Sequence, residues 1–165
     1  GFCVGDSLLE KERVAFAKEI LRRGQERGNV VTLPKDVLVG KEFSQDTPSQ
    51  VFPIDKIPEG WRIMDIGPES IKLFQKKLSA CKTVLWNGPM GVYEFPKFAS
   101  GTRAIAETLA NLKAVTIVGG GSTAEVVESL SYSSRMSHVS TGGGASLEML
   151  EGKILPGVAV LQDAT

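Results

Sequence analysis

The sequence is poor in the residues that build disulfide, metal and acid–base sites. Its 165 residues include two cysteines and one histidine. Cys3 and Cys81 form no Cys-x-x-Cys pair and no metal-ligand spacing, which favours free thiols in a reducing intracellular compartment over secretion. His138 stands at an apolar strand and is interpreted as structural. Because no Gly-x-Ser-x-Gly motif accompanies it, the pattern also argues against a serine hydrolase.

Charge excess and long apolar runs are lacking too. Nineteen basic residues balance nineteen acidic ones, which leaves no basic stripe for nucleic acid or for an anionic membrane surface. No apolar run is long enough to span a bilayer, and no signal-peptide pattern opens the sequence. With 42% hydrophobic residues, a chain of this length can bury a core, so we expect residues 1–165 to form a single domain.

What the sequence does contain is two glycine triplets, each between a β-branched run and a helix-forming run. The first lies within Val115–Ala124 and the second within His138–Leu150. Only glycine lets backbone N–H groups turn toward an anion without a Cβ in the way, and a helix N-terminus adds the positive end of its dipole. One triplet could serve helix–strand packing alone, whereas two in successive units predict a polyphosphate site between two helix starts.

Helices alternate with strands along the chain. Apolar residues at helical spacing predict a helix over residues 10–27 that stops at Gly28, followed by a buried strand over Val30–Leu33. The irregular stretch Asp36–Gly60 is interpreted as an excursion at the edge of the sheet, covered by Trp61. Its short strand candidates are Val37–Val39 and Val51–Phe52.

The later elements complete the predicted fold. A helix should start around Asp65–Ser70 with Pro68 in its first turn, then a strand over Thr83–Trp86 and a helix over about 100–112. Strands separated by helices predict an α/β fold, a three-layer α/β/α arrangement with a mostly parallel, Rossmann-like sheet. Ligands of such sheets bind at the carboxyl ends of the strands. The residues that fall there are Asn87, Gly119–Thr123 and Thr141–Gly144.

Two known phosphate-binding patterns fit only in part. Walker A requires a Lys-Ser/Thr pair after its glycines, and no lysine stands there, which disfavours a P-loop NTPase. Gly119–Ala124 satisfies the dinucleotide fingerprint G-x-G-x-x-A, yet the region about twenty residues further on holds no carboxylate for a ribose. An NAD-type dinucleotide-binding module therefore stays open as an alternative.

Longer motifs resemble phosphoglycerate kinases in register along essentially the whole chain. They are Asp65–Ser70, Trp86–Phe95, Phe98–Thr102, Ser137–Glu148 and Leu150–Val158. The resemblance implies the later part of the C-terminal domain, which binds ATP or ADP with Mg²⁺ in an enzyme that moves a phosphoryl group between ATP and 3-phosphoglycerate. Phosphoglycerate would bind only through an N-terminal domain that this chain lacks, so the isolated chain is expected to be inactive. The implied location is the cytoplasm, or a plastid if the parent protein carries a transit segment.

The resemblance also implies roles for individual residues. Gly142 and Gly143 would donate N–H groups toward the transferred phosphoryl group. Glu94 would hold the ribose hydroxyls, and Pro89 and Val92 would line the base and sugar pocket. The predicted contacts to the nucleotide phosphates are Asn87, Gly120, Gly121, Ser122 and Thr123.

Two positions depart from the family pattern. Ser122 stands where the family has an aspartate that helps to hold Mg²⁺, so no metal ligand is assigned, because a hydroxyl brings no charge to a hard cation. Ile63 stands where the family has a glycine beside the adenine, and a branched side chain would narrow the base pocket. A degenerate, non-catalytic homologue therefore remains a further hypothesis. The missing part of the domain also predicts uncovered apolar surface and self-association of the chain.

Overall fold

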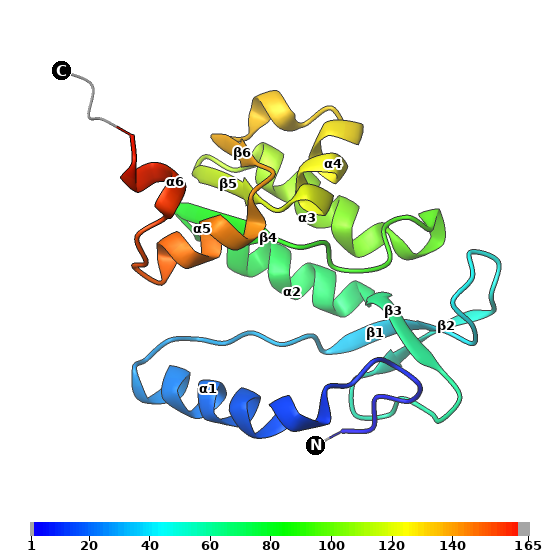
Figure 1. Ribbon diagram of the computed structural model, residues 1–165. Helices are drawn as coiled ribbons and strands as arrows, with labels where there is room; N and C mark the ends of the chain where they lie inside the picture. The colour runs from blue at the N-terminus through cyan, green and yellow to red at the C-terminus, as the bar shows by residue number, and fades with distance from the viewer. Residues whose placement is uncertain (1, 162–165) are drawn as a thin grey trace. The chain divides into compact units, whose positions relative to one another are not determined.

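The computed structural model describes residues 2–161, which divide into two compact units (Figure 1). Unit 1 takes in the residues up to Lys76 together with Met90–Gly101. Unit 2 takes in Lys77–Pro89 and the residues from Thr102 onward. The chain therefore crosses between the units three times, and each unit has its own sheet.

Unit 1 contains an antiparallel sheet of three strands in the order β2-β1-β3. The strands are β1 (Asp36–Gly40), β2 (Ser49–Pro53) and β3 (Arg62–Ile66). Val37 and Val39 of β1 are buried and form a core cluster with Ile57, since alternate strand residues share one face. The hydrophobic residues packed against this cluster are Phe52, Trp61 and Ile63.

This sheet corrects one prediction and confirms others. Both strand candidates within residues 36–60 are confirmed, as is the position of Trp61 over that region. The interpretation as an edge excursion is wrong, because β1 is the central strand of a separate antiparallel sheet. Its third strand, β3, was not predicted. Asp65 and Ile66 belong to that strand, and the helix α2 (Pro68–Leu78) starts only after Gly67.

The N-terminal helix was predicted correctly, but the strand after it was not. A short 3₁₀ helix, η1 (Lys11–Arg13), leads into α1 (Val14–Glu26), and Gly28 ends the turn with a φ of +70°. The segment Val30–Leu33 is neither a strand nor buried, with Val30 76% and Leu33 55% exposed. No described strand pairs with it, and a β-branched run forms a strand only where a partner is present.

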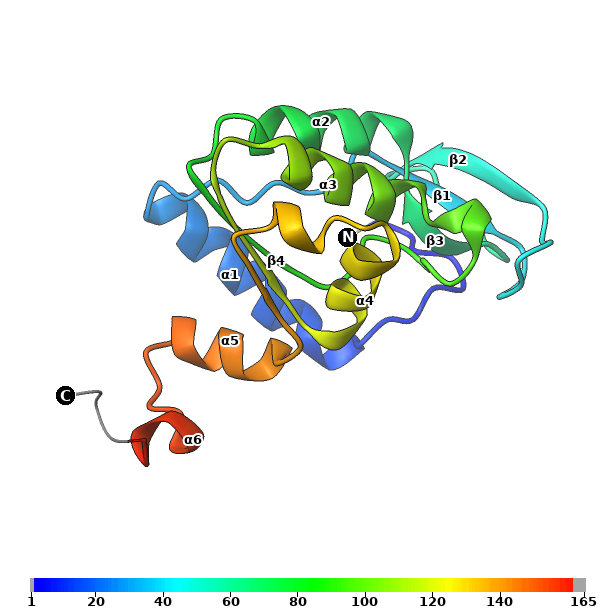
Figure 2. The ribbon, with the colours of Figure 1, turned by 90° about the horizontal axis from the view of Figure 1, so that it is seen from above.

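Unit 2 contains a parallel sheet in the order β4-β5-β6, which confirms the α/β class with a parallel sheet flanked by helices. Helices α3 and α4 lie on one face of this sheet and α5 on the other (Figure 2). The strands are β4 (Thr83–Asn87), β5 (Val115–Gly119) and β6 (His138–Ser140). The helices are α3 (Ser100–Asn111), α4 (Gly121–Ser129), α5 (Gly143–Leu150) and α6 (Pro156–Ala159), with 3₁₀ turns η2 (Pro96–Phe98) in unit 1 and η3 (Ser133–Arg135) in unit 2.

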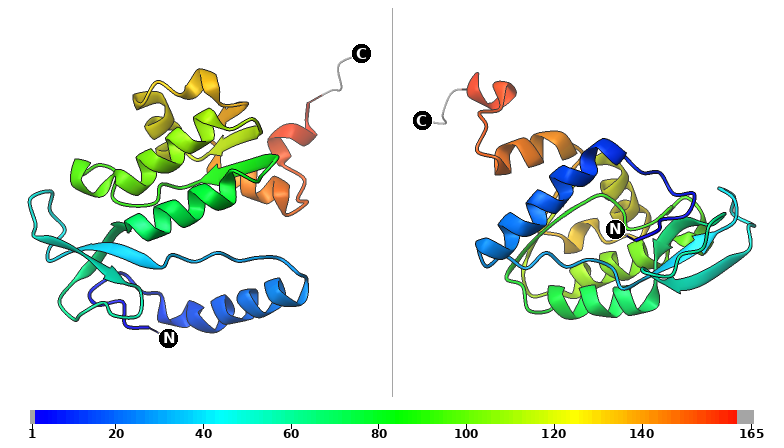
Figure 3. Two further views of the ribbon diagram at one scale, coloured as in Figure 1. Left: turned by 180° about the vertical axis from the view of Figure 1, so that it is seen from behind. Right: turned by 90° about the horizontal axis from the view of Figure 1, so that it is seen from below.

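Apolar side chains remain exposed in both units. In unit 1 they lie on α1 and on the segment that follows it, and in unit 2 on α5, α6 and their neighbours. Figure 3 shows α6 beside α5 and away from the strands. The exposed residues of this last region include Leu147, Met149, Leu150, Ile154 and Val158. The predicted uncovered apolar surface is therefore present. Among the described residues, no helix combines the length and apolar character needed to cross a lipid bilayer.

Candidate functional site

The three parallel strands of unit 2 end at the same edge of the sheet. Asn87, the last residue of β4, is paired with Gly119 at the end of β5, and Gly119 with Ser140 at the end of β6. The first glycine triplet begins at Gly119, and the second follows β6 after Thr141. The helices α4 and α5 start within the triplets, at Gly121 and Gly143. The two turns thus lie next to each other, which is the arrangement that the repeated motif predicted.

The first turn is built around Gly120 and Thr123. Gly120 precedes α4 with φ +95° and ψ 141°, a backbone conformation largely restricted to glycine. Thr123 is fully buried, and its Oγ1 accepts a hydrogen bond from the N–H of Gly88 at 2.7 Å. This bond ties the chain after β4 to the first turn of α4. The Thr123 hydroxyl oxygen is therefore already engaged within the protein.

The second turn packs against the first through bare backbone. A methyl group at Gly143 would lie 2.9 Å from Gly120 Cα and 2.9 Å from Asn87 Oδ1. A methyl group at Gly120 would lie 3.1 Å from the same Asn87 oxygen. The amide of Asn87 thus borders both turns. Ser146 supports the second turn by donating its hydroxyl to the Gly142 carbonyl oxygen at 2.8 Å.

The starts of both helices are open on their outer side. The N-cap residues of α4 and α5 are Gly120 and Gly142, which have no side chain to cap the helix, and neither helix has an acidic residue in its first turn. At the start of α5, the Gly142 N–H donates to Ser140 Oγ at 3.1 Å and the Gly143 N–H to the Thr141 carbonyl oxygen at 3.2 Å. A methyl group at Gly121 or Gly144 would meet no atom within 4 Å, and Ser122 is exposed. The first N–H groups of an α-helix have no partner within the helix. Two adjacent sets of such groups, each at the positive end of a helix dipole, suit an anion with several phosphates.

The remaining predicted residues are divided between the units. Pro89 is half-buried in unit 2, two residues after Asn87. Val92 and Glu94 lie in the segment Met90–Gly101 of unit 1. The Val92 N–H donates to the carbonyl oxygen of Met64 in β3 at 2.8 Å, and the Glu94 side chain is exposed. The backbone beside Glu94 is therefore anchored to the antiparallel sheet.

A buried carboxylate in unit 1 fixes the same segment at its far end. Asp65 is 1% exposed, and it accepts hydrogen bonds from the N–H groups of Ile66 and Gly101, each at 2.8 Å. A methyl group at Gly91 or Gly101 would overlap with this carboxylate. Burial raises the pKa of Asp65 to about 6, against the opposing effect of the N–H groups of Gly101, Ile66 and Ser100. This group was not predicted, since Ser100 and Gly101, the helix-start residues that it binds, lie 35 and 36 residues away along the chain.

Asp36 is a second buried carboxylate, and it binds the N–H groups at the start of α2. Its carboxylate accepts hydrogen bonds from the N–H of Glu69 at 3.1 Å and from the N–H of Ser70 at 2.7 Å, and the Ser70 hydroxyl donates to it at 2.7 Å. Asp36 and Ser70 are both buried. Strand β1 thus supplies the N-terminal cap of a helix that begins about thirty residues later.

The oxygen donors around the two turns do not match the needs of Mg²⁺. Those described are the amide of Asn87, the engaged hydroxyl of Thr123 and the exposed hydroxyl of Ser122. All three are neutral, whereas protein sites for Mg²⁺ use carboxylates. Within residues 2–161, no group of three or more His, Cys, Asp or Glu side chains could hold a metal ion. Ile63, the other departure from the family pattern, packs against the core cluster of unit 1.

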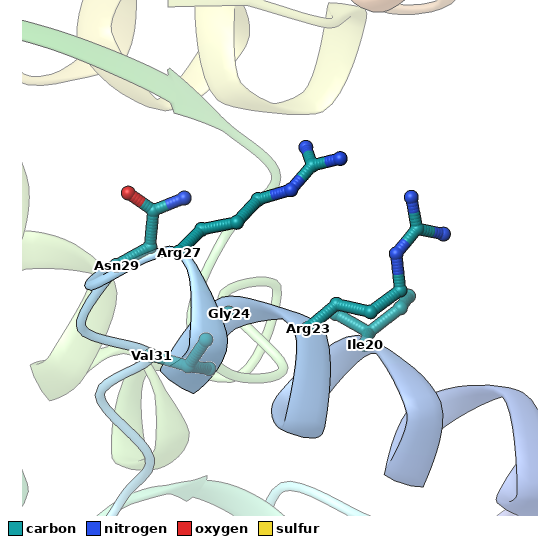
Figure 4. Close-up of a pocket in the computed structure, with 6 residues that line it drawn as sticks. All are labelled: Ile20, Arg23, Gly24, Arg27, Asn29 and Val31. Carbon is teal, nitrogen blue, oxygen red and sulfur yellow. The ribbon is translucent and has the colours of Figure 1, made fainter.

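A shallow pocket elsewhere in unit 1 contains none of the predicted site residues. It lies at the end of α1 and is lined by Ile20, Arg23, Gly24, Arg27, Asn29 and Val31. Figure 4 shows the guanidinium groups of Arg23 and Arg27 extending away from the helix. The glycine turns of unit 2 thus remain the candidate site.

Comparison with known proteins identifies the family of the chain. A family model described as phosphoglycerate kinase matches residues 1–153. The chain is similar to proteins named phosphoglycerate kinase from Microcystis aeruginosa (53% identical over 99% of this chain and 42% of the relative) and from Synechococcus sp. RCC307 (55% identical, with the same coverage). The solved structure of phosphoglycerate kinase from Coxiella burnetii superposes with a TM-score of 0.91 and 40% identity over 96% of this chain and 41% of that one. The chain thus spans about two fifths of the length of these relatives.

Proposed function

Because the chain belongs to the phosphoglycerate kinase family, we propose that the two glycine turns of unit 2 bind the phosphates of ADP or ATP. One observation carries the proposal. The N-cap residues of two adjacent helices, α4 and α5, are Gly120 and Gly142, which have no side chain to cap the helix. Because the first N–H groups of an α-helix have no partner within the helix, an anion that binds at both starts would accept hydrogen bonds from them.

The roles of individual residues follow from this placement. Backbone N–H groups of Gly120 and Gly121 would hold the nucleotide phosphates, and those of Gly142 and Gly143 would stabilise charge on the transferred phosphoryl group. Val92 and Glu94 of unit 1 would contact the base and the ribose, as the family resemblance implies. Phosphoryl transfer needs positioning and charge stabilisation more than a protein nucleophile, so a site made mainly of backbone donors is adequate.

The parent protein would transfer a phosphoryl group between ATP and 3-phosphoglycerate in the cytoplasm or a plastid. This chain would be the later part of its nucleotide-binding domain. We expect it to bind nucleotide without turnover, because the family resemblance implies that phosphoglycerate binds through a different domain. The apolar residues exposed on α1 and α5 would favour self-association of the isolated chain.

An NMR titration of the ¹⁵N-labelled chain with ADP tests the proposal. The amide resonances of residues 119–123 and 141–144 should shift. Asn87→Asp places a negative charge beside both turns and should weaken ADP binding about tenfold or more by like-charge repulsion. Asn111→Asp makes the same chemical change at the end of α3, shortly before β5 begins. This position lies at the amino ends of the strands, far from the glycine turns, so the affinity for ADP should stay within about twofold.

Three results would contradict the proposal. Equal loss of affinity in the two variants would mean that Asn87 does not border the phosphates. NAD binding without ADP binding would favour the dinucleotide-binding alternative instead. Absence of any shift with ADP, also after the chain is joined to the rest of a family member, would favour the degenerate homologue.

A further inference from the structure

We propose that the glycine turns of unit 2 bind a nucleoside diphosphate in its metal-free form in preference to its Mg²⁺ complex. The inference rests on the proposed function, and it specifies the ionic state of the ligand. It follows from the kinds of atoms that the structure places around the two turns. The site is rich in hydrogen-bond donors and contains only neutral oxygen acceptors.

The acceptors are few and uncharged. The Asn87 side-chain oxygen borders Gly120 and Gly143, and Ser122 provides an exposed hydroxyl in the first turn of α4. The Thr123 hydroxyl is fully buried and accepts from the Gly88 N–H. The first acidic residues of α4 and α5 come after their first turns, at Glu125 and Glu148.

A hard divalent cation gains little binding free energy from these neutral oxygen acceptors. Mg²⁺ releases its waters reluctantly and is held at phosphate sites by one or two carboxylates in addition to the phosphates. Here no carboxylate would offset the repulsion between the cation and the positive ends of two helix dipoles. The same geometry favours the ligand's own negative charge, since backbone N–H groups and dipoles attract an anion in proportion to that charge. Loading Mg²⁺ onto the diphosphate removes two charges from the ligand and returns no new protein contact.

Ser122 is the position that controls this preference. Its side chain is exposed in the first turn of α4, next to Gly121, where added atoms meet open space. An aspartate there would add a carboxylate close to the phosphates without disturbing packing, and acidic residues in a first turn stabilise a helix. Ser122→Asp should therefore fold and convert the site to one that favours the magnesium complex. Ser122→Asn has a similar shape without the charge and serves as its matched control.

Isothermal titration calorimetry of the three proteins with ADP tests the inference, once in EDTA and once in excess MgCl₂. The wild-type chain should bind ADP about threefold or more tightly in EDTA. Ser122→Asp should reverse the order, with tighter binding in MgCl₂, and Ser122→Asn should keep the wild-type order. Far-UV circular dichroism and the amide spectrum of each protein establish that the variants are folded.

The outcomes separate this inference from the proposed function. Tighter wild-type binding in MgCl₂ would overturn the inference while leaving nucleotide binding intact. An unchanged order in folded Ser122→Asp would also overturn it, because the preference would then not depend on the missing carboxylate. Failure of the wild-type chain to bind ADP in either buffer would remove the proposed function, and the inference with it.

Discussion

The two units differ in what lies at the N-terminal ends of their helices. In unit 1, the buried carboxylates of Asp36 and Asp65 accept hydrogen bonds from backbone N–H groups at the starts of α2 and α3. In unit 2, α4 and α5 have no acidic residue in their first turns, and their N-cap residues, Gly120 and Gly142, have no side chain to cap the helix. Every α-helix begins with N–H groups that lack partners and a partial positive charge. Where the protein supplies the anion, the end is structural, and where it does not, the end is available to a ligand.

The largest effect is expected for Asp36→Ala, which removes the internal anion from α2. The backbone N–H groups of Glu69 and Ser70 lose their acceptor, whereas the Ser70 hydroxyl keeps the carbonyl oxygen of residue 36 as a partner. Each buried polar group left unpaired costs about 1–3 kcal/mol, so the free energy of unfolding should fall by about 2–6 kcal/mol. Urea denaturation followed by circular dichroism measures this loss.

Asp55→Ala is the matched control for this substitution. Asp55 is exposed and lies in the loop after β2, so its removal should change the free energy of unfolding by less than about 0.5 kcal/mol. If both alanine variants were equally stable, the carboxylate of Asp36 would not be what holds the start of α2. The contrast between the two units would then lose its basis.

The second effect is a pH dependence due to Asp65, whose pKa is about 6 in the folded protein against an ordinary value of 3.8. Because the folded pKa is the higher one, the folded state binds the proton more tightly. The contribution is therefore complete below about pH 4 and is lost as the pH rises through about 6. The shift corresponds to roughly 3 kcal/mol of unfolding free energy.

Asp65→Asn isolates this contribution, since it keeps the shape of the side chain and does not titrate. Between about pH 4 and about pH 7.5, wild type should lose roughly 3 kcal/mol relative to the variant in parallel urea titrations. Other acidic groups contribute equally to both proteins and cancel in the difference. A difference that stays constant across this range would show that burying this anion carries no penalty.

The smallest effect concerns the open helix starts of unit 2. Gly143→Ala would push a methyl group against Gly120 Cα and Asn87 Oδ1, and overpacking of this kind costs about 1–3 kcal/mol. Gly144→Ala places the same methyl group in open space, where replacing a helical glycine stabilises by about 0.5–1 kcal/mol. Thermal unfolding of the two variants provides the comparison. Equal melting temperatures would mean that the two turns are not packed together.

Local patterns were enough to predict much of this structure. Helical spacing located α1, the β-branched runs located β4 and β5, and the repeated glycine triplets predicted two adjacent turns at the carboxyl edge of a parallel sheet. Each of these signals is contained within about a dozen residues. Neighbouring parallel strands also end at the same edge of the sheet, so the parallel pairing of the strands is enough to place the turns that follow them side by side.

What the sequence did not reveal depends on distant partners. Strand β3 forms by pairing with β1, about 25 residues earlier, and its short run resembled the approach to a helix. Val30–Leu33 has strong strand propensity but no described strand beside it. Asp36 and Asp65 reach helix starts 33 to 36 residues away, a separation that no local pattern encodes. In all three cases, contacts with residues distant in the sequence determine the local structure.

The carboxylates of unit 1 also limit what their neighbours can become. A methyl group at Gly67 would collide with Asp36, and one at Gly91 or Gly101 with Asp65. Each aspartate and its facing glycines therefore form a coupled set, in which the cost of a change at one position depends on the residue at the other. A substitution at one of these glycines therefore has to be accompanied by a substitution at the aspartate that faces it. At Gly67 the three nearest atoms to an added methyl group all belong to Asp36, so a larger residue there requires a shorter acid, and a simple reversion to aspartate is then blocked. At Gly91 and Gly101 the Phe98 carbonyl oxygen and the Ile66 side chain also stand in the way.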